Sequence, residues 1–137
     1  MSSATLTKTA METVQQGYAY FGEGNIPALV ELMDDNVVWK DPGKVGTLYV
    51  GTRNGKSEVM EFFKSLNAQV NITKFDIDSI NETNGNVFAT GALTGTGLAT
   101  GLPIDTDWAM FWKVVNGKVT YHHLYTITYI LGKALGV

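Results

Sequence analysis

The spacing of apolar residues changes once along the chain, near Val70. Before that point apolar residues recur every three or four positions, which predicts helices over about 5–22, from Asn25, and over about 55–68. After it, apolar and polar residues alternate, which predicts strands over about 70–80, 87–97, 104–115 and 118–130, followed by a loose tail. Helices followed by an antiparallel meander predict an α+β domain, with helices packed on one side of a curved sheet.

Two pairs of residues mark where the chain should reverse between strands. Asn84-Gly85 and Asn116-Gly117 each stand between alternating segments. Asn-Gly is the strongest short signal for a two-residue turn between antiparallel strands, because both residues accept a positive φ. The last two strands should therefore pair directly with each other.

One short strand is expected within the helical half, from Val37 to Asp41, and Asp34-Asp35-Asn36 should form a break before it. Alternation places Val37, Trp39 and Asp41 on one face. A carboxylate on an apolar face is costly as an ion, so its pKa rises toward the value a general base needs near neutral pH. Asp before Pro-Gly is also a common turn signal. Asp41 is thus either a base or a turn residue.

The strand over 104–115 carries an unusually aromatic face. Trp108, Met110 and Trp112 alternate on it, so they should point to the same side. Such a face lines either a ligand pocket or an aromatic core. Asp105 and Asp107 lie on the opposite face and are expected to meet solvent or another subunit.

The two histidines, His122 and His123, are adjacent in a predicted strand and must point to opposite faces. They cannot bind one metal ion together, and no other metal-binding spacing occurs, so we expect no metal. We also expect no cofactor, because the sequence lacks a phosphate-binding loop or a dinucleotide fingerprint. Whichever histidine shares a cavity with Asp41 would be the second proton carrier.

The composition narrows the class of protein. The chain has 137 residues and should form one domain over 1–137, with its core over about 6–130. The net charge is -3 and the basic residues are scattered, which argues against nucleic acid or a membrane surface as a partner. There are no cysteines, so thiolate nucleophiles are excluded. No signal peptide or membrane span is evident, and the expected location is cytoplasmic.

The order of these motifs resembles the SnoaL-like polyketide cyclases and ketosteroid isomerases, which share the nuclear transport factor 2-like fold. The shared features are two helices, Val-Val-Trp-Lys-Asp-Pro, a third helix containing Phe62-Phe63, and four strands with Asn-Gly before the last. The resemblance implies a cone-shaped fold whose helices and curved sheet enclose a cavity. It also implies that Asp41 is the general base and that His122, rather than His123, faces the cavity.

The resemblance also implies that Phe21, Phe62 and Leu124 face the ligand. Together with the positions that the residue pattern favours, the expected pocket residues are Tyr18, Phe21, Trp39, Tyr49, Phe62, Trp108, Met110, Trp112 and Leu124. The chain departs from the isomerases where they stabilise an oxyanion: the tyrosine position falls at about Gly17 and the acid position near Trp108. Acids that relatives place near Leu124 and Ile127 are absent as well.

Three functions remain open from the sequence. The first is a cofactor-independent isomerase, cyclase or dehydratase acting on a small apolar carbonyl compound, with Asp41 as base and His122 as proton donor or relay. The second is a module that binds a small apolar ligand without turnover. The third is an interaction protein whose cavity is filled by its own aromatic residues. In each case a homodimer is expected, with Tyr121, Tyr125 and Tyr129 as sheet-to-sheet contacts.

Overall fold

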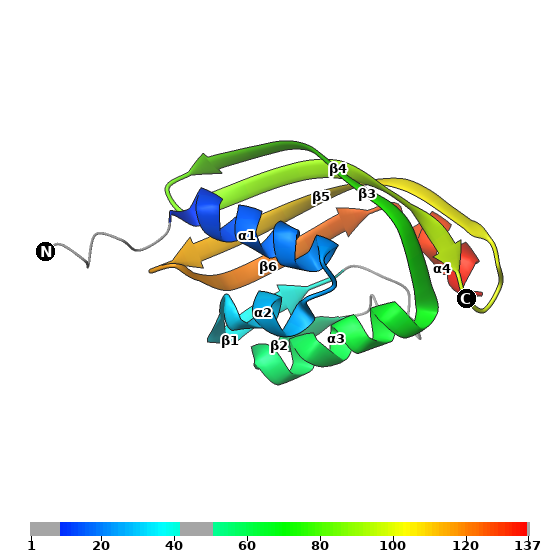
Figure 1. The fold of residues 1–137 in the computed structure, drawn as a ribbon, viewed down its shortest axis with the longest axis horizontal. Coiled ribbons are helices and arrows are strands. Elements are labelled where there is room, and N and C mark those ends of the chain that lie inside the picture. The colour runs from blue at the N-terminus through cyan, green and yellow to red at the C-terminus, as the bar shows by residue number, and fades with distance from the viewer. Residues whose placement is uncertain (1–8, 42–50, 137) are drawn as a thin grey trace, which may run out of the picture.

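The computed structural model describes residues 9–41 and 51–136 (Figure 1). Its helices and strands, in chain order, are α1 (Ala10–Gly22), α2 (Ile26–Glu31), β1 (Met33–Lys40), β2 (Thr52–Asn54), α3 (Gly55–Gln69), β3 (Val70–Thr83), β4 (Asn86–Gly97), β5 (Pro103–Val115), β6 (Lys118–Thr126) and α4 (Thr128–Leu135). No helix within these two ranges is long and apolar enough to cross a membrane.

The strands form one open, mixed sheet in the order β2-β1-β6-β5-β4-β3. Strands β1 and β6 run parallel, and every other neighbouring pair is antiparallel. The sheet is strongly curved, and α1, α2 and α3 lie on its concave side (Figure 1). The expected α+β architecture, with helices on one side of a curved sheet, is therefore confirmed.

Both predicted Asn-Gly turns are present. Asn84 and Gly85 join β3 to β4 with φ angles of 51° and 83°, and Asn116 and Gly117 join β5 to β6 with 51° and 76°. Two successive positive φ angles match the right-handed twist of the flanking strands. The second turn sets the register in which Trp112 pairs with His122.

Helix α1 begins later than its apolar pattern predicted. Thr9 is extended and caps the helix: its hydroxyl accepts from the backbone N–H of Glu12, and the Glu12 carboxylate accepts from the backbone N–H of Thr9. This reciprocal pair satisfies two otherwise free donors. Residues 1–8, including Leu6, lie outside the described residues. The expected stripe continues through the buried Val14 and Tyr18.

Strand β1 is longer than predicted, since it runs through Asp34-Asp35-Asn36, where the sequence indicated a break. Met33 is completely buried and pairs with Val119 of β6. The pairing register then shifts before Val38, so the polar residues form an irregularity inside the strand. The burial of Met33 against β6 extends the strand beyond the polar break.

The C-terminal residues form helix α4, so the prediction of a strand to about 130 and a loose tail is wrong. Leu131 and Ala134 are buried, one helical turn apart, and the hydroxyl of Thr100 donates to the carbonyl of Ala134. Gly97 permits this approach, because a Cβ there would lie 2.0 Å from that carbonyl oxygen. Helix α4 closes one end of the sheet (Figure 1).

Candidate functional site

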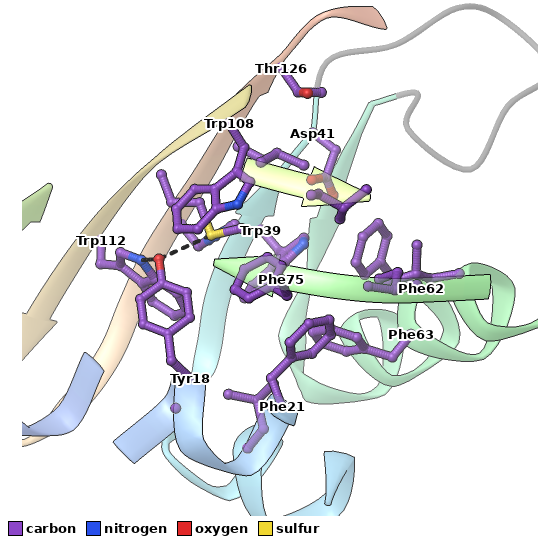
Figure 2. Close-up of a pocket in the computed structure, with 18 of the residues that line it drawn as sticks. Tyr18, Phe21, Trp39, Asp41, Phe62, Phe63, Phe75, Trp108, Trp112 and Thr126 are labelled. Carbon is purple, nitrogen blue, oxygen red and sulfur yellow. Dashed lines mark hydrogen bonds between the residues drawn. The ribbon is translucent and has the colours of Figure 1, made fainter. Parts of the chain in front are cut away.

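A cavity lies between the concave face of the sheet and the helices, and its volume is about 90 Å³. Its wall is almost entirely apolar and aromatic (Figure 2). The structure brings together ten residues singled out from the sequence: Tyr18, Phe21, Trp39, Asp41, Phe62, Trp108, Met110, Trp112, His122 and Leu124. Tyr49 lies outside the described residues.

Asp41 is the only carboxylic acid among the described residues that line the cavity. It follows β1 on the same face as Trp39 and is 3% exposed. Neither carboxyl oxygen has a hydrogen-bond partner in the described parts of the chain. Burial raises the pKa of Asp41 to about 7, while the charge of Arg53 and, less strongly, the nearby indole of Trp39 favour the ionised form. The shift has the direction expected from the sequence.

Arg53 is the residue near Asp41 that the sequence did not indicate. It lies on the three-residue edge strand β2, directly opposite Trp39 of β1. Its Nη1 atom is 4.0 Å from Oδ2 of Asp41, and its guanidinium group lies 5.1 Å from the ring centre of Phe62. Thr52-Arg53-Asn54 is too short and too polar to show a strand period, so no local signal was available.

His122 is the histidine that faces the cavity. It pairs with Trp39 on one side and Trp112 on the other. Its ring stacks on Trp39 with centroids 3.7 Å apart and packs edge-on against Trp112 at 4.4 Å. Burial, together with the charge of His123, lowers its pKa well below the usual value. His122 is therefore a neutral imidazole.

His123 points to the opposite, outer face of the sheet. It is half-buried there and stacks on Tyr125 with ring centroids 4.0 Å apart. It does not line the cavity that contains Asp41 and His122. The choice between the two histidines is therefore settled in favour of His122 as a cavity residue.

Asp41 and His122 line the same cavity without touching each other. No hydrogen bond or ion pair joins them in the structure of residues 9–41 and 51–136. Because His122 is opposite Trp39, Asp41 lies two residues further along the neighbouring strand. The two side chains therefore have no contact through which a proton could pass directly in this arrangement.

A model of the SnoaL-like domain family matches residues 14–122. The chain belongs to this family. The matched segment includes Asp41 and ends at His122, and it excludes α4, which also contributes Leu131 to the cavity wall. No curated protein matches the chain.

Solved structures similar to this SnoaL-like domain show its fold. A nuclear transport factor 2-like protein of unknown function from Burkholderia pseudomallei superimposes with a TM-score of 0.84 at 18% identity, covering 95% of this chain and 99% of its own. A Bacillus subtilis protein described as an isomerase superimposes with a TM-score of 0.79 at 21% identity, and the match covers 93% of this chain and 92% of that protein. A Pseudomonas putida protein described as a polyketide cyclase superimposes with a TM-score of 0.75 at 19% identity, and the match covers 93% of this chain and 98% of that protein.

The hydroxyl group of Tyr18 is bound within the wall of the SnoaL-like cavity. It accepts a hydrogen bond from Nε1 of Trp112 at 3.0 Å and donates to Sδ of Met110 at 3.2 Å (Figure 2). Burial raises its pKa above the usual value, so the phenol stays protonated. Tyr18 thus shapes the wall and orients Trp112.

Several wall residues were missed by the sequence. Phe63, Leu66, Phe75 and Leu131 also line the cavity, from α3, β3 and α4. The first three lie in segments predicted from their apolar pattern, but such a pattern does not separate core from cavity wall. No group of three or more potential metal ligands occurs among the described residues.

Proposed function

We propose that this SnoaL-like domain is a cofactor-independent enzyme that transfers a proton on a small, apolar carbonyl compound. The observation that supports this proposal is the state of Asp41: a carboxyl group buried in an apolar cavity, with neither oxygen hydrogen-bonded to a described residue and a pKa of about 7. A general base is most effective when its pKa lies near the working pH.

Asp41 would remove a proton from the carbon next to the carbonyl group, and the electron pair would move onto the carbonyl oxygen. His122 is neutral, so one ring nitrogen carries a hydrogen that can be donated to this developing oxyanion. The proton held by Asp41 would then return to a different atom of the substrate. Isomerisation, aldol-type cyclisation and dehydration all fit this sequence of steps.

The size of the cavity limits the part of the substrate that enters it. Its volume is about 90 Å³. A cavity needs roughly 10–15 Å³ to hold even one water molecule, so this space is small. We therefore expect only a small apolar group that bears a carbonyl to enter it.

The test is a panel of small enones and β-keto compounds assayed with the wild-type protein and with Asp41→Asn. Asparagine keeps the shape of the side chain but cannot accept the proton, so turnover should fall by about 10²–10⁴-fold. Asp105→Asn, on the exposed face of β5, is the matched control and should keep full activity. Equal turnover by wild type and Asp41→Asn would refute the mechanism.

A second candidate is a ligand-binding module without turnover. It is favoured by the absence of another acid among the described residues of the cavity wall and by the internal hydrogen bonds of the Tyr18 hydroxyl. Exchange of α-hydrogen for deuterium in 2-cyclohexen-1-one separates the two candidates. An enzyme with Asp41 as base would speed this exchange in deuterated water, whereas a binding module would bind the ketone and leave its hydrogens in place.

A further inference from the structure

The protein has three tryptophans, and all three line the cavity, but only one of their N–H groups has a hydrogen-bond partner among the described residues. Trp112 donates to the hydroxyl of Tyr18 at 3.0 Å. The Nε1 atom of Trp39 is buried and has no hydrogen-bond partner among the described residues, although it lies near enough to the Asp41 carboxyl group to favour its ionised form. The Nε1 atom of Trp108 is buried and has no hydrogen-bond partner among the described residues.

The ring of Trp108 is held firmly in its position. It stacks on the ring of Phe75, with ring centroids 4.9 Å apart and planes inclined by 7°. Its centroid lies 5.8 Å from that of the Tyr18 ring (Figure 2). On the adjacent strand it lies over Gly91, where a Cβ would come within 2.4 Å of Cζ2 of the indole. Since packing restrains the ring on these sides, its N–H keeps one direction at the cavity wall.

An unpaired N–H in this setting needs an explanation, because buried donors nearly always have an acceptor. Trp108 is only 4% exposed, so bulk water does not supply one. The cavity is the space that the indole faces, and an acceptor that enters it with a ligand would complete the bond. A donor fixed before binding also loses little freedom when the bond forms.

We propose that the indole N–H of Trp108 anchors the bound molecule by donating a hydrogen bond to its carbonyl oxygen. His122, whose ring nitrogens have no hydrogen-bond partner in the part of the chain that the structure describes, offers a second neutral donor in the same wall. Because neither donor is charged, the site selects an uncharged carbonyl compound over a carboxylate or phosphate of similar size. The carbonyl class rests on the proposed function, whereas the donor role of Trp108 requires binding only.

Nuclear magnetic resonance of the full chain, labelled with ¹⁵N, observes this bond directly. The three indole N–H signals are assigned with Trp39→Phe, Trp108→Phe and Trp112→Phe, and the protein is titrated with 2-cyclohexen-1-one. Methylenecyclohexane, which has a similar shape but no acceptor oxygen, is the matched control ligand. We expect a saturable downfield shift of the Trp108 signal with the ketone only, while the Trp112 signal, already bonded to Tyr18, moves less.

The affinity of the two ligands provides a second readout. Trp108→Phe should lower the affinity for the ketone by about threefold to tenfold, the effect of one lost hydrogen bond. The affinity for methylenecyclohexane should be nearly the same in the wild type and in Trp108→Phe. If Trp108→Phe does not fold, benzothienylalanine at position 108 preserves the shape of the indole and removes only the N–H.

The proposal is overturned if the Trp108 signal stays fixed at ketone saturation, if the hydrocarbon moves it equally, or if the ketone produces no saturable change. Repeating the titration with Asp41→Asn separates this proposal from the proposed enzyme. A shift of Trp108 in that variant, combined with unchanged turnover, would retain the anchor and reject the base. Loss of turnover in Asp41→Asn, combined with no shift of the Trp108 signal, would retain Asp41 as the base and reject Trp108 as the anchor.

Discussion

The carboxyl group of Asp41 and the guanidinium group of Arg53 approach to 4.0 Å, a separation that permits attraction but is too long for a hydrogen bond. Both facing atoms are buried and neither has a hydrogen-bond partner among the described residues. The charge of Arg53 favours the ionised carboxylate, and burial opposes it more strongly, so the pKa settles at about 7. A tighter ion pair would hold the carboxylate permanently ionised and make it a weaker base.

Replacing Arg53 with methionine should raise the pKa of Asp41 above 7, because it removes the positive charge and keeps most of the side-chain stem. The other titratable groups of the cavity wall, His122 and Tyr18, are uncharged, and Lys40 is exposed on the opposite face of β1. The rising limb of the activity–pH profile should move to higher pH. Lys56→Met, which removes a surface lysine paired with Glu31 and Asp35, should leave the profile in place.

The stability of the fold should fall as the pH rises through the range in which Asp41 ionises. The pKa is about 7 in the folded state and 3.8 in the reference state, so the folded protein binds this proton more tightly. The proton on Asp41 adds to the free energy of unfolding by an amount on the order of a few kcal/mol. This stabilisation is complete below about pH 4 and is lost as the pH rises past about 7. Urea unfolding across this range measures it.

The Asp41→Asn variant isolates this contribution. It should remove the part of the slope that Asp41 causes, and at about pH 8 it should be more stable than the wild type because no charge is buried. Asp105→Asn, on the exposed side of β5, should retain the wild-type slope. An identical dependence on pH in wild type and Asp41→Asn would show that Asp41 is ionised at its ordinary pKa in the folded protein.

Gly91→Ala should disturb the cavity wall as well as the sheet. Its Cβ would lie 1.9 Å from the carbonyl oxygen of Asp76 and 2.4 Å from the ring of Trp108, so the backbone must move. We expect a loss of about 1–3 kcal/mol in unfolding free energy and a change in the near-ultraviolet circular dichroism of the tryptophans. Gly22→Ala, where nothing lies within 4 Å, should be neutral or stabilising by up to about 1 kcal/mol.

Leu131→Ala tests whether α4 is an integral part of the core. Leu131 is 5% exposed and lines the cavity, so its truncation should cost about 2–5 kcal/mol in unfolding free energy and enlarge the cavity. Tyr129→Ala on the same helix, at a side chain that is 74% exposed, should change stability by no more than about 0.5 kcal/mol. Equal effects of the two substitutions would mean that the helix does not pack as described.

An outer aromatic stripe crosses β4, β5 and β6 on the face away from the helices, and it consists of Phe88, Phe111, Tyr121, His123 and Tyr125. We expect two copies of the chain to associate through it. Phe88→Glu, at a side chain that is 55% exposed, should give the mass of a monomer in light scattering at micromolar concentration, and Leu98→Glu in the β4–β5 connection should leave the dimer intact. A wild-type monomer would refute the expectation.

Tyr129 lies on α4, so its predicted place in a strand is wrong.

The sequence by itself determined the features that depend on neighbouring residues. Alternation along one strand placed Asp41 beside Trp39, and a helical period placed Phe62 on the inner side of α3. Asn116-Gly117 required a tight reversal, and alternation placed His122 and His123 on opposite faces, whereas the choice of His122 for the cavity came only from the family resemblance. Apart from that choice, each of these follows from the period of the backbone and from the few residues that accept a positive φ.

Tertiary structure decided the features that depend on residues far apart in the chain. Arg53 reaches Asp41 only because a three-residue strand pairs with β1, and no period can show in so short a segment. Helix α4 forms where β-branched and aromatic residues indicated a strand, because Leu131 and Ala134 find a buried site against the sheet. Whether the N–H of Trp108 has a hydrogen-bond partner likewise depends on which side chains from distant segments surround it in the cavity wall. Burial and pairing between distant segments set the chemistry of the site, and local sequence patterns do not encode them.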